Sequence, residues 1–492
     1  MSEACDLPAR VARRLMRQGA LSPVELWESC CRRVDAVNPA VNAVIWEDRE
    51  AGLAQAKAAE AALAQEGILG AIHGVPVALK DNRPAIGQPC TNGSLLHVND
   101  PPATADEPGV AQLRAQGAIL AQRTNLPEYG AGANTVNRVF GATGNPFDTT
   151  LTAAGSSGGS AAALACGMAP FATGSDYGGS LRSPAAFCGV AGFRPSLGVV
   201  PRPAAGSLLG PWPVNGPMAR DIADLRLLLS AQAFADARDP WSFGAKIPPV
   251  DRLPHVASLT VAFSTDLGCC PVDKDIAATF RARMAMLEGA VGELEEAAPN
   301  WPLSADAIHD VFDVTRALSF VGSFEKLVAE KRELLDRNVI DNTEAGAAYT
   351  LSDCARAELG QAAIYRAFTA FFEEYDVLIA PAASVAPFPH AENHPAEING
   401  EAMPTYMRWL SLAYVPTLAF ACSAVIPCGL GPTGMPFGLQ VIGPFRADDR
   451  VLDAAEALEG FFAGHEESAR PEPDLAALTA APPMPRPERV AR

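Results

Sequence analysis

Short apolar runs alternate with longer amphipathic stretches along most of the chain. The segment Ser22-Pro23-Val24-Glu25 places serine at an N-cap, proline at the first helical position and glutamate at the third. This capping box predicts a helix over residues 22–37. An alanine-rich stretch that ends near residue 65 also predicts a helix. Further helical patterns cover residues 110–116, 161–166, 221–230, 274–295, 305–335 and 352–374.

Continuous apolar runs bounded by glycine, proline or polar residues predict buried strands. They fall at residues 43–46, 75–79, 118–121, 170–173, 259–263, 377–379, 423–426 and 438–442. Strands that alternate with helices in this way are typical of an α/β fold. We therefore expect one large mixed sheet that helices cover on both faces.

Two long stretches contain no charged residue. Residues 149–175 combine a glycine–serine run with alanines, and such small residues allow close backbone approach, so they predict a buried, ordered loop that opens a helix. Residues 409–445 are interrupted by five prolines, and no unbroken apolar run reaches the roughly 20 residues that a spanning helix needs. Strands of an internal sheet are expected there, and no membrane association.

Composition narrows the class of protein. With 49% hydrophobic and 19% charged residues, the chain of 492 residues is typical of a well-packed globular protein. A formal charge of −18 argues against a nucleic acid as partner, because binding phosphates requires a basic face. Eleven cysteines without a regular framework, and an N-terminus without an apolar signal segment, favour a cytoplasmic protein with reduced thiols.

The balance of helix, strand and charge suggests a division of the chain into five parts. We expect an N-terminal helical segment (1–70), a core (71–235), a helix-rich insertion or cap (236–375), the C-terminal part of the core (376–468), and a proline-rich, extended or disordered tail (469–492).

Ser180 is a candidate nucleophile, because it follows two glycines in ATGSDYGGSLRSPAAFCG. Consecutive backbone N–H groups at this turn could form the donor cluster that an oxyanion needs. A candidate base is Lys80, at the end of the apolar run VPVAL, where burial would lower its pKa toward neutrality. A neutral amine could accept the serine proton directly or through a hydroxyl such as Ser156 or Ser157.

Two other interpretations of these segments stay open. Gly155 to Gly159 matches G-x-S-x-G, which would make Ser157 the nucleophile of an α/β-hydrolase with distant Asp and His partners. Alternatively, both glycine–serine segments are anion-binding nests or turns, and Lys80 pairs with Asp81 at a strand end.

Taken together, these segments resemble the amidase signature family. Residues 152–200, TAAGSSGGSAAALACGMAPFATGSDYGGSLRSPAAFCGVAGFRPSLGVV, are similar to its signature from end to end, and HGVPVALKDN resembles the segment with its catalytic lysine. The likeness continues through TNLPEYG, GATGNPFD, GPMARDIADLRLLL and GMPFGLQVIG, and covers about residues 8–465.

This resemblance implies a single large α/β/α amidase-signature fold and a Ser–Ser–Lys triad. Ser180 would be the nucleophile, Ser156 a bridging serine on a cis peptide, and Lys80 the base. The spacing of the two serines matches the family and favours Ser156 over Ser157. The likeness further assigns the oxyanion hole to the backbone of Tyr177, Gly178, Gly179 and Ser180, and supporting roles to Ser157, Asp176 and Arg182.

The resemblance also implies the reaction. We expect hydrolysis of the C–N bond of a small, largely uncharged aryl or alkyl amide, anilide or carbamate, without metal or organic cofactor. The alternative is the glutaminase subunit of an amidotransferase complex. GSLLGPWPVNGP and TYMRWLSLAYVPTLAF depart from that subunit's pattern. The likeness also suggests a homodimer. Four aromatic residues are candidates for the substrate pocket: Tyr129, Trp212, Tyr406 and Trp409.

One departure from the family concerns the backbone before the bridging serine. Ala154 stands where the family commonly has glycine. Its methyl group is tolerable if φ at this position is negative.

Overall fold

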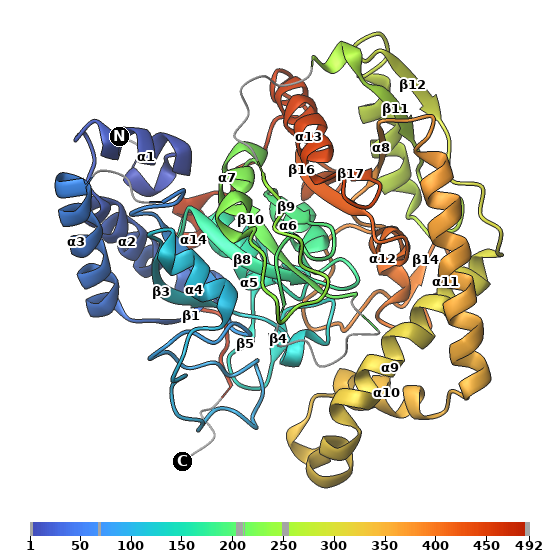
Figure 1. Ribbon diagram of the computed structural model, residues 1–492, viewed down its shortest axis with the longest axis horizontal. Coiled ribbons are helices and arrows are strands. Elements are labelled where there is room, and N and C mark those ends of the chain that lie inside the picture. Colours follow the sequence, from blue (N-terminus) through green and yellow to red (C-terminus); the bar gives the residue numbers. More distant parts are fainter. Residues whose placement is uncertain (1–2, 67–69, 203–209, 211, 248–254, 488–492) are drawn as a thin grey trace.

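The computed structural model describes residues 3–66, 70–202, 210, 212–247 and 255–487. The predicted capping box is present at the start of α2, Pro23–Val41. Ser22 Oγ accepts from the Glu25 N–H at 3.0 Å, and the Glu25 carboxylate accepts from the Ser22 N–H at 2.7 Å. This helix lies beside α1, Ala9–Arg17, and α3, Arg49–Glu66, at the N-terminal side of the molecule (Figure 1).

Eleven strands of the described chain form one mixed sheet. The sheet is parallel from β3 through β2 to β8, antiparallel along β8–β10–β9–β16–β17–β13, and parallel again from β13 through β11 to β12. In spatial order the strands are β1 (Val44–Glu47), β3 (Ile119–Thr124), β2 (Pro76–Lys80), β8 (Phe171–Asp176), β10 (Val214–Ala219), β9 (Ala191–Arg194), β16 (Cys422–Leu430), β17 (Pro436–Gly443), β13 (Val377–Pro381), β11 (Thr260–Phe263) and β12 (Glu293–Glu296).

Alternate side chains of each central strand enter two separate hydrophobic clusters. In β2, Val77 and Leu79 belong to one cluster and Ala78 to the other, as the two-residue period of a strand requires. Helices cover both faces, which confirms the predicted fold class. The cluster with Val77 and Leu79 also contains side chains of α1, α4 (Pro108–Ala115), α7 (Ile222–Gln232), α8 (Lys274–Ala285) and α13 (Asp448–Ala463). The cluster with Ala78 contains side chains of α5 (Gly158–Ala165), α6 (Arg182–Cys188), α9 (Ala305–Lys331), α11 (Leu351–Phe371) and α12 (Ser411–Leu418).

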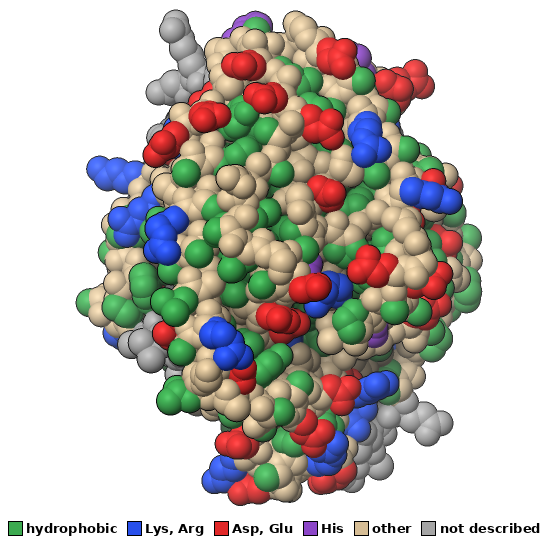
Figure 2. Space-filling model, turned by 90° about the vertical axis from the view of Figure 1, so that its right-hand side faces the viewer, with side chains coloured by type: hydrophobic (Ala, Val, Ile, Leu, Met, Phe, Trp, Pro, Cys, Tyr) green, Lys and Arg blue, Asp and Glu red, His purple; other side chains and the backbone are tan. Residues whose placement is uncertain are grey.

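Three helices, α9, α10 (Arg337–Ala347) and α11, stand together on the side of the molecule opposite the N-terminal helices (Figure 1). We call these three helices the cap. Acidic, basic and apolar side chains are interspersed over this side of the molecule (Figure 2). None of the helices in the described ranges is both long and apolar enough to cross a membrane.

The predicted elements need several corrections. The helix expected over 274–295 ends at Ala285, and Glu293–Glu296 is the edge strand β12. The sequence patterns missed the helices α1, α6, α10, α12 and α13 and the strands β9 and β10. Helix α12 lies within residues 409–445, where only strands were expected. The tail is not simply extended, because α14, Leu475–Ala480, forms within it and packs on α2. Residues 488–492 of the tail lie outside the described residues.

The five-part division of the sequence stays a prediction. The remaining elements of the described chain are short. The two-residue and hairpin strands are β4 (Val136–Asn137), β5 (Gly141–Ala142), β6 (Gly144–Asn145), β7 (Asp148–Thr152), β14 (Glu397–Ile398) and β15 (Glu401–Ala402). Single 3-10 turns occur at Ala4–Asp6, Glu128–Gly130, Val256–Ser258, Arg332–Leu334 and Arg408–Leu410.

Candidate active site

Strand β2 delivers Lys80 to the centre of the molecule. The strand is buried along its whole length and lies between β3 and β8, and the lysine at its carboxyl end is fully buried. Its amine donates to three hydroxyl oxygens, those of Ser156 at 2.7 Å, Ser157 at 2.9 Å and Ser175 at 3.0 Å.

The surroundings of Lys80 favour its neutral form. Burial lowers the pKa of Lys80 to about 7; Asp176 opposes this shift and Arg83 adds to it. The alternative pairing with Asp81 does not occur, because the Asp81 carboxylate lies 3.5 Å from Arg123 and accepts from the Thr91 N–H and hydroxyl. Lys80 therefore faces hydroxyl groups, and its pKa is shifted toward the neutral amine.

Ser156 lies in the loop between β7 and α5, and the Gly155–Ser156 peptide bond is cis. The methyl group of Ala154 was expected to be tolerable at negative φ, but φ at Ala154 is +55°, in the left-handed region that favours glycine. Its carbonyl oxygen accepts from the Thr135 hydroxyl at 2.8 Å, and its N–H donates to Thr152 Oγ1 at 3.0 Å. These two bonds hold the backbone that leads into the serine loop.

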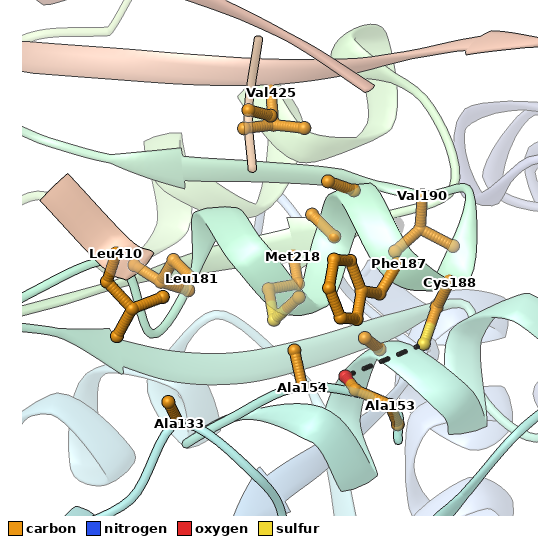
Figure 3. Close-up of a cluster of buried hydrophobic side chains, with 14 of the residues drawn as sticks. Ala133, Ala153, Ala154, Leu181, Phe187, Cys188, Val190, Met218, Leu410 and Val425 are labelled. Carbon is orange, nitrogen blue, oxygen red and sulfur yellow. Dashed lines mark hydrogen bonds between the residues drawn. The ribbon is translucent and has the colours of Figure 1, made fainter. Parts of the chain in front are cut away.

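Small side chains let the loop approach α6 closely. Ala153, Ala154, Phe187 and Cys188 lie within one buried cluster, and the Cys188 sulfur is 3.9 Å from the Ala153 carbonyl oxygen (Figure 3). The uncharged stretch that contains this loop is thus buried and ordered, as predicted from its composition.

The turn from β8 to α6 is organised by Asp176. Its carboxylate accepts from Arg182 at 2.8 and 3.0 Å and from the backbone N–H groups of Gly179 and Leu181, both at 3.1 Å. Arg194 contacts the same carboxylate at 3.3 Å. Burial alone would raise the pKa of Asp176, but the two guanidinium groups and the N–H donors hold it well below its usual value.

Ser180 follows this turn and opens onto the same cavity as Ser156. In the part of the chain that the structure describes, no hydrogen bond joins the Ser180 hydroxyl to Ser156 or to any other group. Among the predicted oxyanion donors, the Gly179 N–H is engaged by Asp176, whereas the N–H groups of Gly178 and Ser180 have no acceptor among described residues. These two donors are therefore free to meet a substrate oxygen.

A cavity of about 690 Å³ lies over Ser156, Ser175 and Ser180. Side chains of the cap and of the segment just before α12 also line it. They include Arg316, Leu318, Ser319, Phe320, Phe324, Tyr406, Met407 and Leu410.

Two of the four aromatic candidates line this cavity, and two do not. Tyr129 and Tyr406 are at the wall, and the Tyr129 ring packs on Phe324 of the cap at 4.9 Å. Trp212 is not among the residues that line the cavity, and its ring stacks on Phe420 at 5.1 Å. Trp409 does not line the cavity either, and it is fully buried among Phe187 and Phe388.

Sequence reasoning missed three residues of the site. Ser175 contacts the Lys80 amine, and its position directly before Asp176 was an available signal. Arg194 braces Asp176 from β9, and Arg316 reaches the cavity from the cap. No pattern in the chain marks the last two, because their partners are distant in sequence.

Comparison with known proteins identifies the class to which this fold and site belong. The Amidase family matches residues 25–452. The acylamidase of Rhodococcus erythropolis is 34% identical over 89% of this chain and 92% of its own, and a glutamyl-tRNA(Gln) amidotransferase subunit of Streptomyces avermitilis is 32% identical over 93% and 95%. The crystal structure of a bacterial aryl acylamidase superposes with a TM-score of 0.86 at 27% identity, covering 97% and 99% of the chains.

These likenesses define a hydrolase that acts on the carbon–nitrogen bonds of amides. The chain belongs to the amidase family.

Proposed function

We propose that the chain hydrolyses a small, largely uncharged amide, such as an aryl or alkyl amide, anilide or carbamate, through an acyl-enzyme on Ser180. The observation that carries this proposal is the buried Lys80 amine. It has a pKa of about 7 and hydrogen bonds to Ser156, beside a cavity that also exposes Ser180. Amide hydrolysis by a serine needs such a proton acceptor.

In the proposed acylation step, Ser180 Oγ attacks the amide carbonyl carbon while its proton passes to Ser156 Oγ. Ser156 in turn gives its own proton to neutral Lys80. The C–N bond then breaks as Ser156 protonates the leaving nitrogen and recovers a proton from Lys80, so that a neutral amine departs. Water attacks the acyl-enzyme through the same relay, which releases the acid and restores Ser180.

The free N–H groups of Gly178 and Ser180 are the proposed oxyanion donors, with the Tyr177 N–H beside them. Donors of this kind stabilise the tetrahedral intermediate by about 3–4 kcal/mol each in measured cases. Asp176 and Arg182 act as positioning residues, because they hold the turn that carries these N–H groups.

The test is intact-protein mass spectrometry after brief exposure to acetanilide, an alkyl amide, an aryl carbamate and glutamine. The wild-type chain, Ser180→Ala and a control in an exposed serine of the cap, Ser352→Ala, are run in parallel. We expect an acyl adduct and product release with the wild type and the control only. Equal hydrolysis by Ser180→Ala would overturn the proposal.

Glutamine is included because of the second candidate function, a glutaminase subunit. The likeness to an amidotransferase subunit over 93% of this chain favours keeping it in the test. An adduct formed from glutamine alone would support that function, and adducts from the anilide or carbamate would support a stand-alone amidase.

The same proposal places the chain in the cytoplasm as a homodimer. The cysteines are free in the structure, which agrees with a reducing compartment. Light scattering of the purified chain tests the dimer: a monomeric mass at micromolar concentration would contradict it.

A further inference from the structure

A cationic side chain lines the substrate cavity from the cap. Arg316 is on α9 and is 6% exposed, and its side chain lines the same cavity as Ser156 and Ser180. Across the described ranges, no carboxylate lies within 4.0 Å of its guanidinium; Asp313, one turn earlier, pairs with Arg408 at 3.9 Å. A buried guanidinium without a carboxylate is unusual, because desolvation of the charge is costly unless a partner compensates it.

The hydrogen bonds of Arg316 leave most of its donors unused. One terminal nitrogen donates to Asn342 Oδ1 and the other to the Tyr406 hydroxyl oxygen. A guanidinium has five N–H groups, so three of them have no acceptor among the described residues. Asn342 also donates to the Tyr406 oxygen, at 3.4 Å, so the hydroxyl hydrogen of Tyr406 is itself free to be donated.

The other neighbours of Arg316 hold it in place but accept no hydrogen bond. The guanidinium carbon lies 4.4 Å from the centre of the Phe320 ring and 5.1 Å from that of Tyr406, so both rings contribute cation–π attraction. The Tyr177 hydroxyl oxygen, on another residue of the cavity wall, is buried and has no partner among the described residues. The unused hydrogen-bonding groups in this part of the cavity are therefore the N–H groups of Arg316 and the hydroxyl groups of Tyr177 and Tyr406.

We propose that Arg316 and Tyr406 bind an oxygen acceptor, a carbonyl or a carboxylate, on the substrate at a distance from the amide that is cleaved. The inference rests on the proposed function, since it concerns the substrate of the same cavity. It makes Arg316 a specificity-determining residue: amides with a second oxygen group are preferred over amides whose remaining part is hydrocarbon.

The experiment compares matched anilides by chromatographic measurement of released aniline. Pentananilide is the hydrocarbon reference, 4-oxopentananilide adds a ketone oxygen, and the monoanilide of succinic acid adds a carboxylate. A second series, the acetanilides with para ethyl, acetyl or carboxylate groups, places the same groups on the amine side. The quantity compared is the ratio of kcat/KM for each oxygen-bearing substrate to that of its hydrocarbon reference.

In the wild-type enzyme we expect at least one oxygen-bearing substrate to be favoured by about tenfold or more, the size of effect that a hydrogen bond to a charged group produces. Arg316→Met, which removes all five N–H groups, should reduce that ratio to near one. Tyr406→Phe removes only the hydroxyl and should reduce it by about threefold or more. The matched control is Arg337→Met, an exposed arginine on α10 that pairs with Asp341, and it should leave the ratio unchanged.

A ketone advantage alone identifies a neutral acceptor, and a larger carboxylate advantage identifies an anion. No advantage in either series, or an advantage that Arg316→Met and Tyr406→Phe leave intact, overturns the inference. If Arg316→Met does not fold, the ratio for Tyr406→Phe decides.

A binding measurement separates this inference from the proposed function. Calorimetry with Ser180→Ala compares the affinities of the same pairs without turnover, and weaker binding of the oxygen-bearing partner contradicts the inference even if no anilide is cleaved. Conversely, Ser180-dependent hydrolysis of pentananilide without any oxygen preference supports the proposed function and overturns the inference.

Discussion

The serine loop and the cap meet across one cavity, but they hold their charged groups in different ways. In the core, Asp176 and Arg182 are completely buried, and the carboxylate is saturated by two arginines and two backbone N–H groups. In the cap, the ion pairs within single helices, such as Lys326 with Glu330 at 3.9 Å in α9 and Arg337 with Asp341 in α10, are on the surface. Arg316 is the buried charge of the cap wall, and its donors are not saturated.

This difference suggests a division of labour. A saturated, buried network has one arrangement of low energy, because any displacement leaves a charge without its partner. It suits the part of the site where proton transfer requires fixed distances. The unused N–H donors of Arg316 can bind a group of the substrate, so the cap suits substrate selection. The predictions below test this separation.

The largest effect is expected from Lys80→Met, which removes the amine but keeps a buried side chain of similar length. Loss of a general base lowers rates by about 10²–10⁴-fold, and we expect a fall in kcat of that size with little change in KM. The control is Lys326→Met, an exposed lysine of the cap, which should leave kcat unchanged. Steady-state kinetics on acetanilide measure both, and near-normal turnover by Lys80→Met would contradict the role of this lysine.

A second prediction concerns stability. Arg182→Met leaves Asp176 buried with only part of its compensation, and breaking a buried pair in this way costs about 3–5 kcal/mol. We expect a large drop in the denaturant midpoint, and loss of Ser180 labelling by a fluorophosphonate in the fraction that stays folded. Arg337→Met removes the same charge from the surface of the cap and should leave the midpoint unchanged. Equal midpoints for the two variants would show that the core network is no more important to stability than a surface pair.

The third prediction is a pH dependence that originates in the core. Because burial lowers the pKa of Lys80 to about 7, the lysine is protonated below this pH and cannot accept a proton from Ser156. We expect kcat/KM to fall about tenfold for each pH unit below 7 and to level off above it. The same profile should persist in Tyr406→Phe, since burial raises the pKa of Tyr406 above its usual value and its titration lies outside this range. A flat profile between pH 5 and 8 would exclude Lys80 as the titrating base.

The smallest effect is expected from Phe324→Ala in the cap. This ring packs against Tyr129 of the core and lines the cavity, so its removal widens the substrate site without touching the serine loop. We expect KM for acetanilide to rise about threefold to tenfold, as for a lost apolar contact of about 1 kcal/mol, while the rate of Ser180 labelling by a small fluorophosphonate stays the same. Slower labelling would mean that the cap also affects the reactivity of Ser180.

Much of the core could be predicted from local patterns. The capping box at Ser22 predicted the start of α2, and the apolar run before Lys80 predicted β2, because both signals lie within a few neighbouring residues. Strand β10, VNGPMA, was missed because glycine and proline are unfavourable in strands; it forms through antiparallel pairing with β8 and β9 on its two sides. Helix α10 was missed because its sequence, RNVIDNTEAGA, has few apolar positions.

For the site, the sequence by itself determined which chemical groups are available: a lysine at the end of a buried strand, and serines beside glycine turns that leave backbone N–H groups exposed. These are local properties of residue type and spacing. Only the tertiary structure decided that Trp212 and Trp409 pack inside the core, that Asp176 accepts a hydrogen bond from the Gly179 N–H, and that Arg316 lines the same cavity as the serines. The physical reason is that burial and partnership arise between residues far apart in the chain, and no local pattern records them.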